Sequence, residues 1–298
     1  MSARVPLALV ILWLCWGSSF PAMRVMVGTL PPLTTSGAVF LTAGVVLAVA
    51  RARDLRRTSV PALRRAALVG CCLLGAQGLA ALAVAHVPAS TSALLAASIP
   101  LWLVVLRAVV GEPTGRREWG CLVLGLAGVA VIVLAGSGGP AWTPWALLVL
   151  GTSVLWAAGT LVASRSVVLP TPGAATAVQL VAGGALVLTA GLAVEPAAPG
   201  VGNGSSWAAV AVLLVVDSLA GFALFTWLVR HAPVSVVGTY AYAVPVVAYL
   251  TGVLVLGEEF RPVVLVGAAL VLTAVALQVR QHALARPHSG PGDLGRRP

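Results

Sequence analysis

The feature that most constrains this chain is a series of apolar, uncharged runs separated by short segments that hold most of the charged residues. The runs are roughly 18–23 residues long, the length at which a helix crosses about 30 Å of hydrocarbon. Backbone groups in lipid must be hydrogen-bonded within the protein, and the ten-residue alternation of barrel strands is not visible. The chain is 59% hydrophobic and 9% charged, whereas about a quarter of an average soluble domain is charged. We therefore predict an all-α integral membrane protein.

Ten transmembrane helices are expected, five in each half of the 298-residue chain. Residues 1–137 would form a first repeat, residues 138–280 a second repeat, and residues 281–298 a disordered basic tail. The first expected span is predicted to be a retained helix and not a cleaved signal peptide, because it lacks a small-x-small cleavage site. The spans are predicted at residues 6–23, 31–50, 66–86, 88–106, 118–136, 143–163, 172–193, 207–229, 233–256 and 262–280.

The two halves echo each other. His86-Val-Pro-Ala-Ser, Pro100 and Gly111-Glu112 recur as His231-Ala-Pro-Val-Ser, Pro245 and Gly257-Glu258. Earlier in each half, residues 38–44 match residues 177–183 at five of seven places. The chain is thus a tandem duplication, which in a membrane protein is typical of a transporter.

The basic residues predict the orientation. All 18 are arginines, and sixteen of them fall on one side if the N-terminus is cytoplasmic, which leaves Arg24 and Arg261 outside. Both termini are therefore expected in the cytoplasm, and the protein itself is expected in the inner membrane. The net charge of +10 reflects this topology and attraction to membrane lipids, not nucleic-acid binding. Because five spans per repeat is an odd number, the two repeats are predicted to be inverted.

Several motifs resemble the EamA family of the drug/metabolite transporter superfamily. Residues 16–21, Trp-Gly-Ser-Ser-Phe-Pro, are similar to its Trp-Gly-(Ser/Thr)-x-Phe signature, and the duplicated stretches from His86 and from His231 resemble the second half of one EamA repeat. The family often carries Arg-Phe in its second helix, where this chain has Val39-Phe40. The resemblance implies a ten-helix inner-membrane carrier with a central cavity that exports amino acids or other small metabolites.

An ionisable side chain in mid-span is the first candidate for ion coupling, because it costs about 2.5–3.5 kcal/mol at a helix centre. Asp217 is the only residue of this kind in the ten expected spans. It would bind a proton or a cation in a cavity, or else it would tie its helix to a neighbouring hydroxyl group. Its counterpart in the first half is Cys72, so such a role would be asymmetric.

Other deep polar and aromatic residues are candidates for lining the cavity. Mid-helix prolines bend a helix, so Pro100 and Pro245 are predicted hinges. The small residues can serve helix packing instead of substrate contact, and the amides can bind substrate or bridge helices. The predicted cavity residues are Trp16, Ser18, Gln77, Trp102, Trp156, Gln179 and Tyr242.

Glu112 and Glu258 end predicted spans and are expected to pair with arginines near the membrane surface, Glu112 with Arg116 four residues on. The spacing of the cysteines matches no metal or redox pattern, and no nucleotide-binding or catalytic motif is found in the sequence. The protein is therefore predicted to be a secondary transporter and not an enzyme.

The predicted function is export of a small metabolite or an amino acid by alternating access. Multidrug efflux or solute uptake is the alternative within the same class, and a non-transporting membrane scaffold is the alternative of another class. The glycines of residues 118–136 can pack within one chain or between two copies, so a homodimer is left open.

Overall fold

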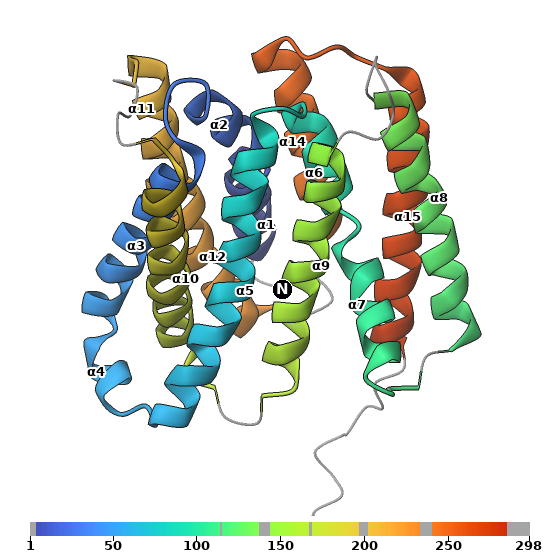
Figure 1. Ribbon diagram of the computed structural model, residues 1–298. Coiled ribbons are helices and arrows are strands. Elements are labelled where there is room, and N and C mark those ends of the chain that lie inside the picture. The colour runs from blue at the N-terminus through green and yellow to red at the C-terminus, as the bar shows by residue number, and fades with distance from the viewer. Residues whose placement is uncertain are drawn as a thin grey trace, which may run out of the picture.

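The computed structural model describes residues 4–113, 115–136, 144–166, 169–196, 202–232 and 240–284. Within these ranges every regular element is helical, which confirms the predicted class (Figure 1). Helices lie at all ten predicted positions, although residues 233–239 of the ninth and the tail from residue 285 are outside the described ranges. The elements are α1 (Arg4–Gly17), α2 (Ser19–Met26), α3 (Pro32–Ala50), α4 (Ala52–Arg56), α5 (Val60–Val84), α6 (Ala89–Ala96), α7 (Ile99–Val109), α8 (Arg116–Gly136), α9 (Pro144–Ser164), α10 (Pro172–Val194), α11 (Gly204–Ala211), η1 (Val212–Gly221), α12 (Phe222–His231), α14 (Tyr240–Leu256) and α15 (Pro262–Leu284).

Seven of these segments are long and apolar enough to cross a membrane, judged by length and composition. Two of the seven, Arg4–Met26 and Ala89–Val109, are built from consecutive helices, and a third joins α11 to η1. The stretches Ala243–Leu256 and Pro262–Leu277 are shorter apolar helices.

Proline fixes where many of the helices begin. A proline in the first turn lacks an N–H that would be unpaired there in any case, and its backbone angle already suits a helix. Prolines stand at the first or second position of α3, α5, α7, α9, α10 and α15, as Pro32, Pro61, Pro100, Pro144, Pro172 and Pro262.

The second helices of the two halves, α3 and α10, pack against each other in opposite directions. Gly44, near the end of α3, lies against Val181 in the first half of α10, and Gly191, near the end of α10, lies against Thr34 at the start of α3. The carboxylate of Glu195, just after α10, accepts hydrogen bonds from the N–H groups of Leu33 and Thr34 (2.7 and 2.8 Å). Corresponding helices therefore run antiparallel, as inverted repeats require.

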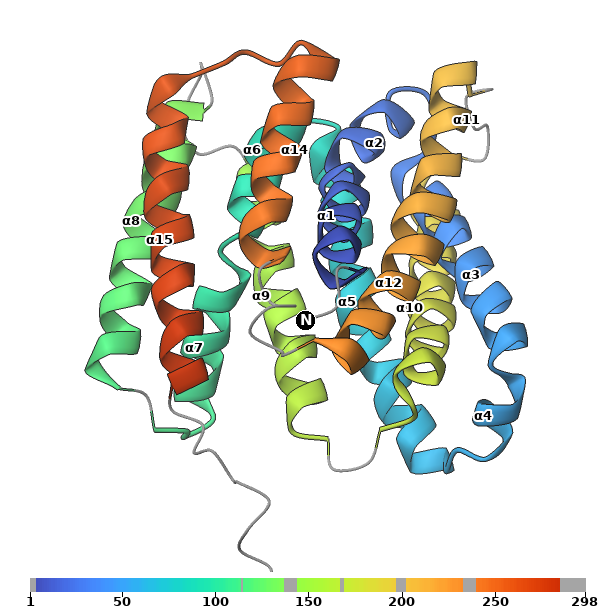
Figure 2. The same cartoon turned by 180° about the vertical axis from the view of Figure 1, so that it is seen from behind.

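The fifth helices, α8 and α15, pair at one edge of the bundle (Figures 1 and 2). Gly128 and Gly267 face each other so closely that a Cβ atom on either would lie 2.7–2.8 Å from the carbonyl oxygen of the other. Gly125 packs against Leu101, so this glycine also contacts a helix of the same chain. The homodimer stays a prediction, and Gly120 is the glycine of this helix with open space around it.

We call the end of the bundle formed by residues 51–59, 110–113 and 165–166 the arginine-rich end, the lower end in Figure 1. Here Glu112 accepts hydrogen bonds from Arg107 (2.6 Å) and Arg165 (2.7 Å), and these contacts tie α7 to α9. The predicted pairing with an arginine is confirmed, but the partners are not the expected Arg116. A hydrogen-bonded turn at Gly111 (φ +81°) directs Glu112 back toward α7 instead of forward along α8.

Acidification is expected to weaken these contacts. Hydrogen bonds from Arg107 and Arg165 hold the pKa of the Glu112 carboxyl below its ordinary value of 4.5. A lowered pKa in the folded state means that the stabilisation is present above the unfolded-state pKa and is lost as the pH falls through the folded-state value. The difference in melting temperature between wild type and Glu112→Gln in detergent should therefore shrink from about pH 6 to about pH 3. A difference that persists in acid would show that the carboxylate charge does not cause it.

Glu258 acts differently, because its carboxylate caps a helix at the end of the bundle opposite the arginine-rich end. Gly257 has a left-handed backbone (φ +67°), which turns the chain back after α14. The Glu258 carboxylate then accepts hydrogen bonds from the N–H groups of Ala89 (2.6 Å) and Ser90 (2.9 Å) at the start of α6. The expected arginine partner is thus replaced by backbone donors, which favour a negative charge at a helix N-terminus.

Removing this cap is expected to destabilise the protein. Glu258→Ala would leave the first N–H groups of α6 without their acceptor, at a cost of about 1–2 kcal/mol. The adjacent Glu259→Ala is the matched control, since that side chain is 71% exposed and pairs with Arg261, two residues on. Thermal unfolding in detergent should separate the two variants, and equal melting temperatures would contradict the capping role.

Candidate functional site

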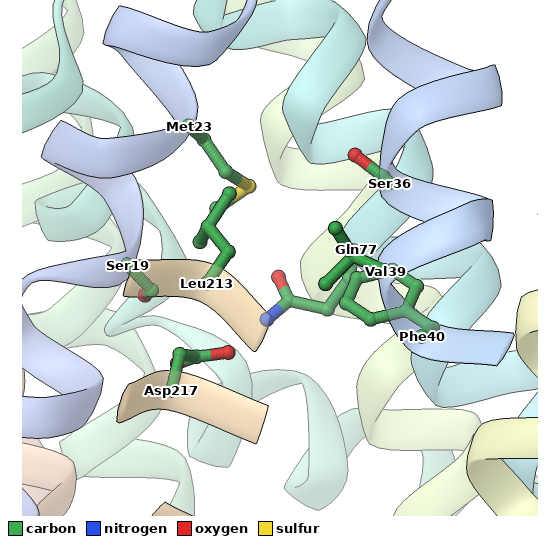
Figure 3. A pocket seen from close by; sticks show the side chains of 8 residues that line it. All are labelled: Ser19, Met23, Ser36, Val39, Phe40, Gln77, Leu213 and Asp217. Carbon is green, nitrogen blue, oxygen red and sulfur yellow. The ribbon is translucent and has the colours of Figure 1, made fainter. Parts of the chain in front are cut away.

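A small cavity lies where α2, α3 and α5 of the first half meet η1 of the second half (Figure 3). Its volume is about 10 Å³, which is about the space that one water molecule needs. The cavity would therefore have to widen to hold a metabolite. The lining residues are Ser19, Met23, Ser36, Val39, Phe40, Gln77, Leu213 and Asp217.

Asp217 supplies the charge of this cavity. It lies in η1, a ten-residue π-helical segment in the middle of its span, and this wider helical form occurs often at functional sites. The side chain is 8% exposed and makes no hydrogen bond or ion pair with any residue that the structure describes. No arginine, lysine or histidine is among the lining residues. A buried carboxylate without a basic partner is costly, so a cation or a proton from outside would stabilise it.

Gln77 is a second predicted site residue that lies in the same cavity lining as Asp217. Figure 3 shows the two side chains reaching into the cavity from opposite sides, Gln77 from α5 and Asp217 from η1. Gln77 has no hydrogen bond with the described residues, so both its amide oxygen and its amide nitrogen are available to a ligand.

Two serine hydroxyls complete the polar lining. Ser19 Oγ donates to the carbonyl oxygen of Trp16 (2.7 Å), so its oxygen faces the cavity as an acceptor. Ser36 is 2% exposed, and its hydroxyl has no hydrogen-bond partner among the described residues. A buried, unpaired hydroxyl of this kind needs a water molecule or a ligand to bind it.

Trp16 lies beside the cavity and does not line it. Its ring packs against Phe222 (5.7 Å between centroids), Phe225 (5.3 Å) and Tyr240 (5.0 Å). The indole nitrogen abuts Gly221 at the end of η1, where an added Cβ would lie 2.5 Å away. This aromatic cluster supports the helix that carries Asp217.

The other predicted cavity residues lie elsewhere. Ser18 donates to the carbonyl oxygen of Cys15 within its own helix (2.8 Å), and Trp102 donates to Ser98 on its own span (3.2 Å). Trp156 and Gln179 are half-buried on α9 and α10, and the backbone of Gln179 packs against Gly70. None of these four lines the cavity described above. The Tyr242 side chain lies outside the part that the structure describes, although its backbone belongs to α14.

The predicted hinges differ from each other in structure. Pro100 stands in the first turn of α7, just after the helical path of its span is interrupted between Ala96 and Ile99. Pro245 lies inside α14, which continues through it. Their role as hinges stays a prediction.

Six lining residues were not predicted from the sequence. Four of them, Met23, Val39, Phe40 and Leu213, are apolar, and Met23 and Leu213 carry no signal that separates them from other membrane residues. Val39-Phe40 did stand out as the place where the Arg-Phe pair of similar proteins is missing, and the structure places both side chains in the cavity lining. The cavity therefore has no guanidinium group at this position.

Arg24 links α2 to α5 at one end of the cavity region. This residue follows Met23 on α2 and donates to the carbonyl oxygens of Val84 (2.6 Å) and Ala85 (2.5 Å) at the C-terminal end of α5. A positive charge is favourable at a helix C-terminus, so the contact holds α2 against α5 on the side away from the arginine-rich end.

Comparison with known proteins identifies the family. The model of the EamA-like transporter family matches residues 4–134 and 143–280, one match in each half. The chain is 32% identical over 277 residues to "Uncharacterized inner membrane transporter YedA" of Escherichia coli, a match that spans 91% of this chain and 89% of that protein. It is 28% identical over 284 residues to "Uncharacterized transporter YvbV" of Bacillus subtilis, with 92% and 91% covered.

A third relative is the "Probable terminal-alkyne amino-acid exporter" of Streptantibioticus cattleyicolor, 31% identical over 287 residues and 91% covered on both sides. A solved structure described as "Crystal structure of protein" has the same fold, with a TM-score of 0.66 at 23% identity over 96% of this chain and all of that one. The protein is thus a multi-pass inner-membrane transporter of a small molecule and not an enzyme. With a match in each half and relatives aligned over nine-tenths of their length, this chain belongs to the EamA-like transporter family.

Proposed function

We propose that this transporter exports a small metabolite or an amino acid by alternating access, with both termini in the cytoplasm. The observation that carries the proposal is the small cavity at the junction of the two inverted halves, with one carboxylate, one amide and two hydroxyls in an otherwise apolar lining. Cavities with a few polar groups in an apolar wall are the usual form of small-molecule sites. Export, rather than uptake, is supported by the amino-acid exporter among the relatives.

Coupling to protons is proposed at Asp217. A proton-coupled transporter needs a group whose charge changes during the cycle, and Asp217 is the acidic residue of the cavity lining. Its π-helical segment and the interrupted span at Pro100 give both halves of the protein a deformable element. Rocking of one half against the other would then expose the cavity to the two sides in turn.

Flux from reconstituted proteoliposomes tests this function. Vesicles holding purified protein would be loaded with pooled labelled amino acids and metabolites, and efflux would be followed with and without a pH gradient. Efflux above that of protein-free vesicles, faster with the gradient, is the expected result. Folded protein that moves none of the compounds under either condition would contradict the proposal and favour the scaffold alternative.

A further inference from the structure

We propose that the cavity holds its cargo by a protonated amine, and that the preferred cargo is a small organic amine without a carboxylate group. This inference rests on the proposed transport function and narrows the cargo to one charge class. Of the two cargo types proposed above it favours a metabolite over an amino acid, so the amino-acid exporter among the relatives then supports only the direction of transport.

The charges around the cavity favour a cation. Asp217 is buried, and the lining residues include no basic side chain to neutralise it. The nearest arginine along α2 is Arg24, which is already bound to the carbonyl oxygens of Val84 and Ala85. An ammonium group would therefore be the first positive charge that the carboxylate meets, whereas a cargo carboxylate would add a second negative charge in a medium of low polarity.

The hydrogen-bonding groups point the same way. An ammonium group has three N–H donors and no acceptor, and an ionised carboxylate has acceptors only. The cavity offers the Asp217 oxygens, the Ser19 oxygen whose proton is bound to Trp16, and the Gln77 amide oxygen. A carboxylate on the cargo would find as side-chain donors only the Ser36 hydroxyl and the Gln77 amide nitrogen.

The apolar residues of the lining indicate that the rest of the cargo molecule is apolar. Met23, Val39, Phe40 and Leu213 form an apolar wall around the polar groups (Figure 3). The volume of about 10 Å³ admits a group of about the size of water, such as an ammonium head. An apolar tail would lie against the wall once α2, α3 and η1 move apart.

Three compounds that share one branched alkyl group separate the charge classes: leucine, leucine without its carboxylate, and leucine without its amino group. Isoamylamine is a cation, leucine is a zwitterion with the same side chain, and 4-methylpentanoate is the corresponding anion. Calorimetric titration of the full-length protein in detergent is expected to give a Kd for isoamylamine at least about tenfold lower than for leucine, with no binding of 4-methylpentanoate. Asp217→Asn should weaken isoamylamine binding by at least about tenfold, whereas Asp217→Glu, which keeps the charge, should keep the order of the three compounds.

Several outcomes would overturn the inference. Leucine or 4-methylpentanoate binding as tightly as isoamylamine would do so, as would amine binding that Asp217→Asn leaves unchanged. If folded wild-type protein binds no amine, the inference is also contradicted. Asp217 would then bind protons and not the cargo. If other metabolites still leave proteoliposomes in that case, the transport function holds and only the charge class is wrong. Amine binding without flux of any compound would instead contradict the proposed function.

Discussion

Replacing Asp217 by asparagine is expected to lower gradient-driven flux of the reconstituted protein by roughly ten- to a hundredfold, because a hydrogen bond to a charged group contributes about 1.5–3 kcal/mol. The asparagine has the same shape and cannot carry the charge. Asp217 has no partner among the described residues, so the change strands no buried donor or cation. The yield and melting temperature of the variant should therefore equal or exceed those of wild type, since a buried charge without a partner destabilises the fold.

The combination of lost flux and retained stability separates the two roles considered for Asp217. A carboxylate that tied η1 to a neighbouring helix would, when replaced, lower the melting temperature as well as the flux. Asp54→Asn is the matched control, because Asp54 is 40% exposed at the arginine-rich end, 3.9 Å from Arg51, and outside the cavity lining. Flux equal to wild type in Asp217→Asn would refute a coupling role at this position.

The sequence predicts that Asp217 and Gln77 lie deep in their spans, but it does not predict the direction in which most side chains point. Depth follows from counting residues along an apolar run at 1.5 Å per residue. Direction depends on how a helix is rotated against its neighbours, and successive residues point about 100° apart. For this reason Ser18 was predicted to line the cavity, whereas the adjacent Ser19 is the residue found in the lining.

Helix ends were predicted less well where arginines enter a helix. The third span was expected from residue 66, whereas α5 begins at Val60 and includes Arg64 and Arg65. Charged residues mark where a span leaves the hydrocarbon, but a helix can continue into the headgroup layer because arginine side chains reach out to water. The same reason explains why α15 runs beyond the expected residue 280 to Leu284.

The π-helical segment of η1 had no signal in the sequence. Residues 212–221, Val-Leu-Leu-Val-Val-Asp-Ser-Leu-Ala-Gly, would form an ordinary α-helix by composition. Leu213 and Asp217, four residues apart on this segment, both line the cavity, a spacing that an ordinary α-helix would also place on one face. The π-helical form depends on the packing of η1 against α1, α2 and α3, which a sequence read locally does not contain.

The close packing of α3 against α10 predicts a second large effect, this time on stability. Gly44 lies so near α10 that an added Cβ would be 2.6 Å from the backbone nitrogen of Val181 and 2.9 Å from the carbonyl carbon of Leu180. Backbone atoms of a helix cannot move aside as a flexible side chain can, so a larger residue must push the two helices apart. Overpacking typically costs about 1–3 kcal/mol, and Gly44→Leu should reach or exceed the upper value.

Gly151→Leu is the matched control, because Gly151 is an exposed helical glycine on α9 with nothing within 4 Å of an added Cβ. Leucine favours a helix by up to about 1 kcal/mol over glycine, so this variant should melt at or above the wild-type temperature. Gly44→Leu should melt several degrees lower, and its flux should fall too, because α3 carries the cavity residues Ser36, Val39 and Phe40. Equal melting of the two leucine variants in detergent and in lipid would mean that α3 and α10 separate at little cost. The contact between the two halves would then be a sliding surface of the transport cycle and not a fixed support of the cavity.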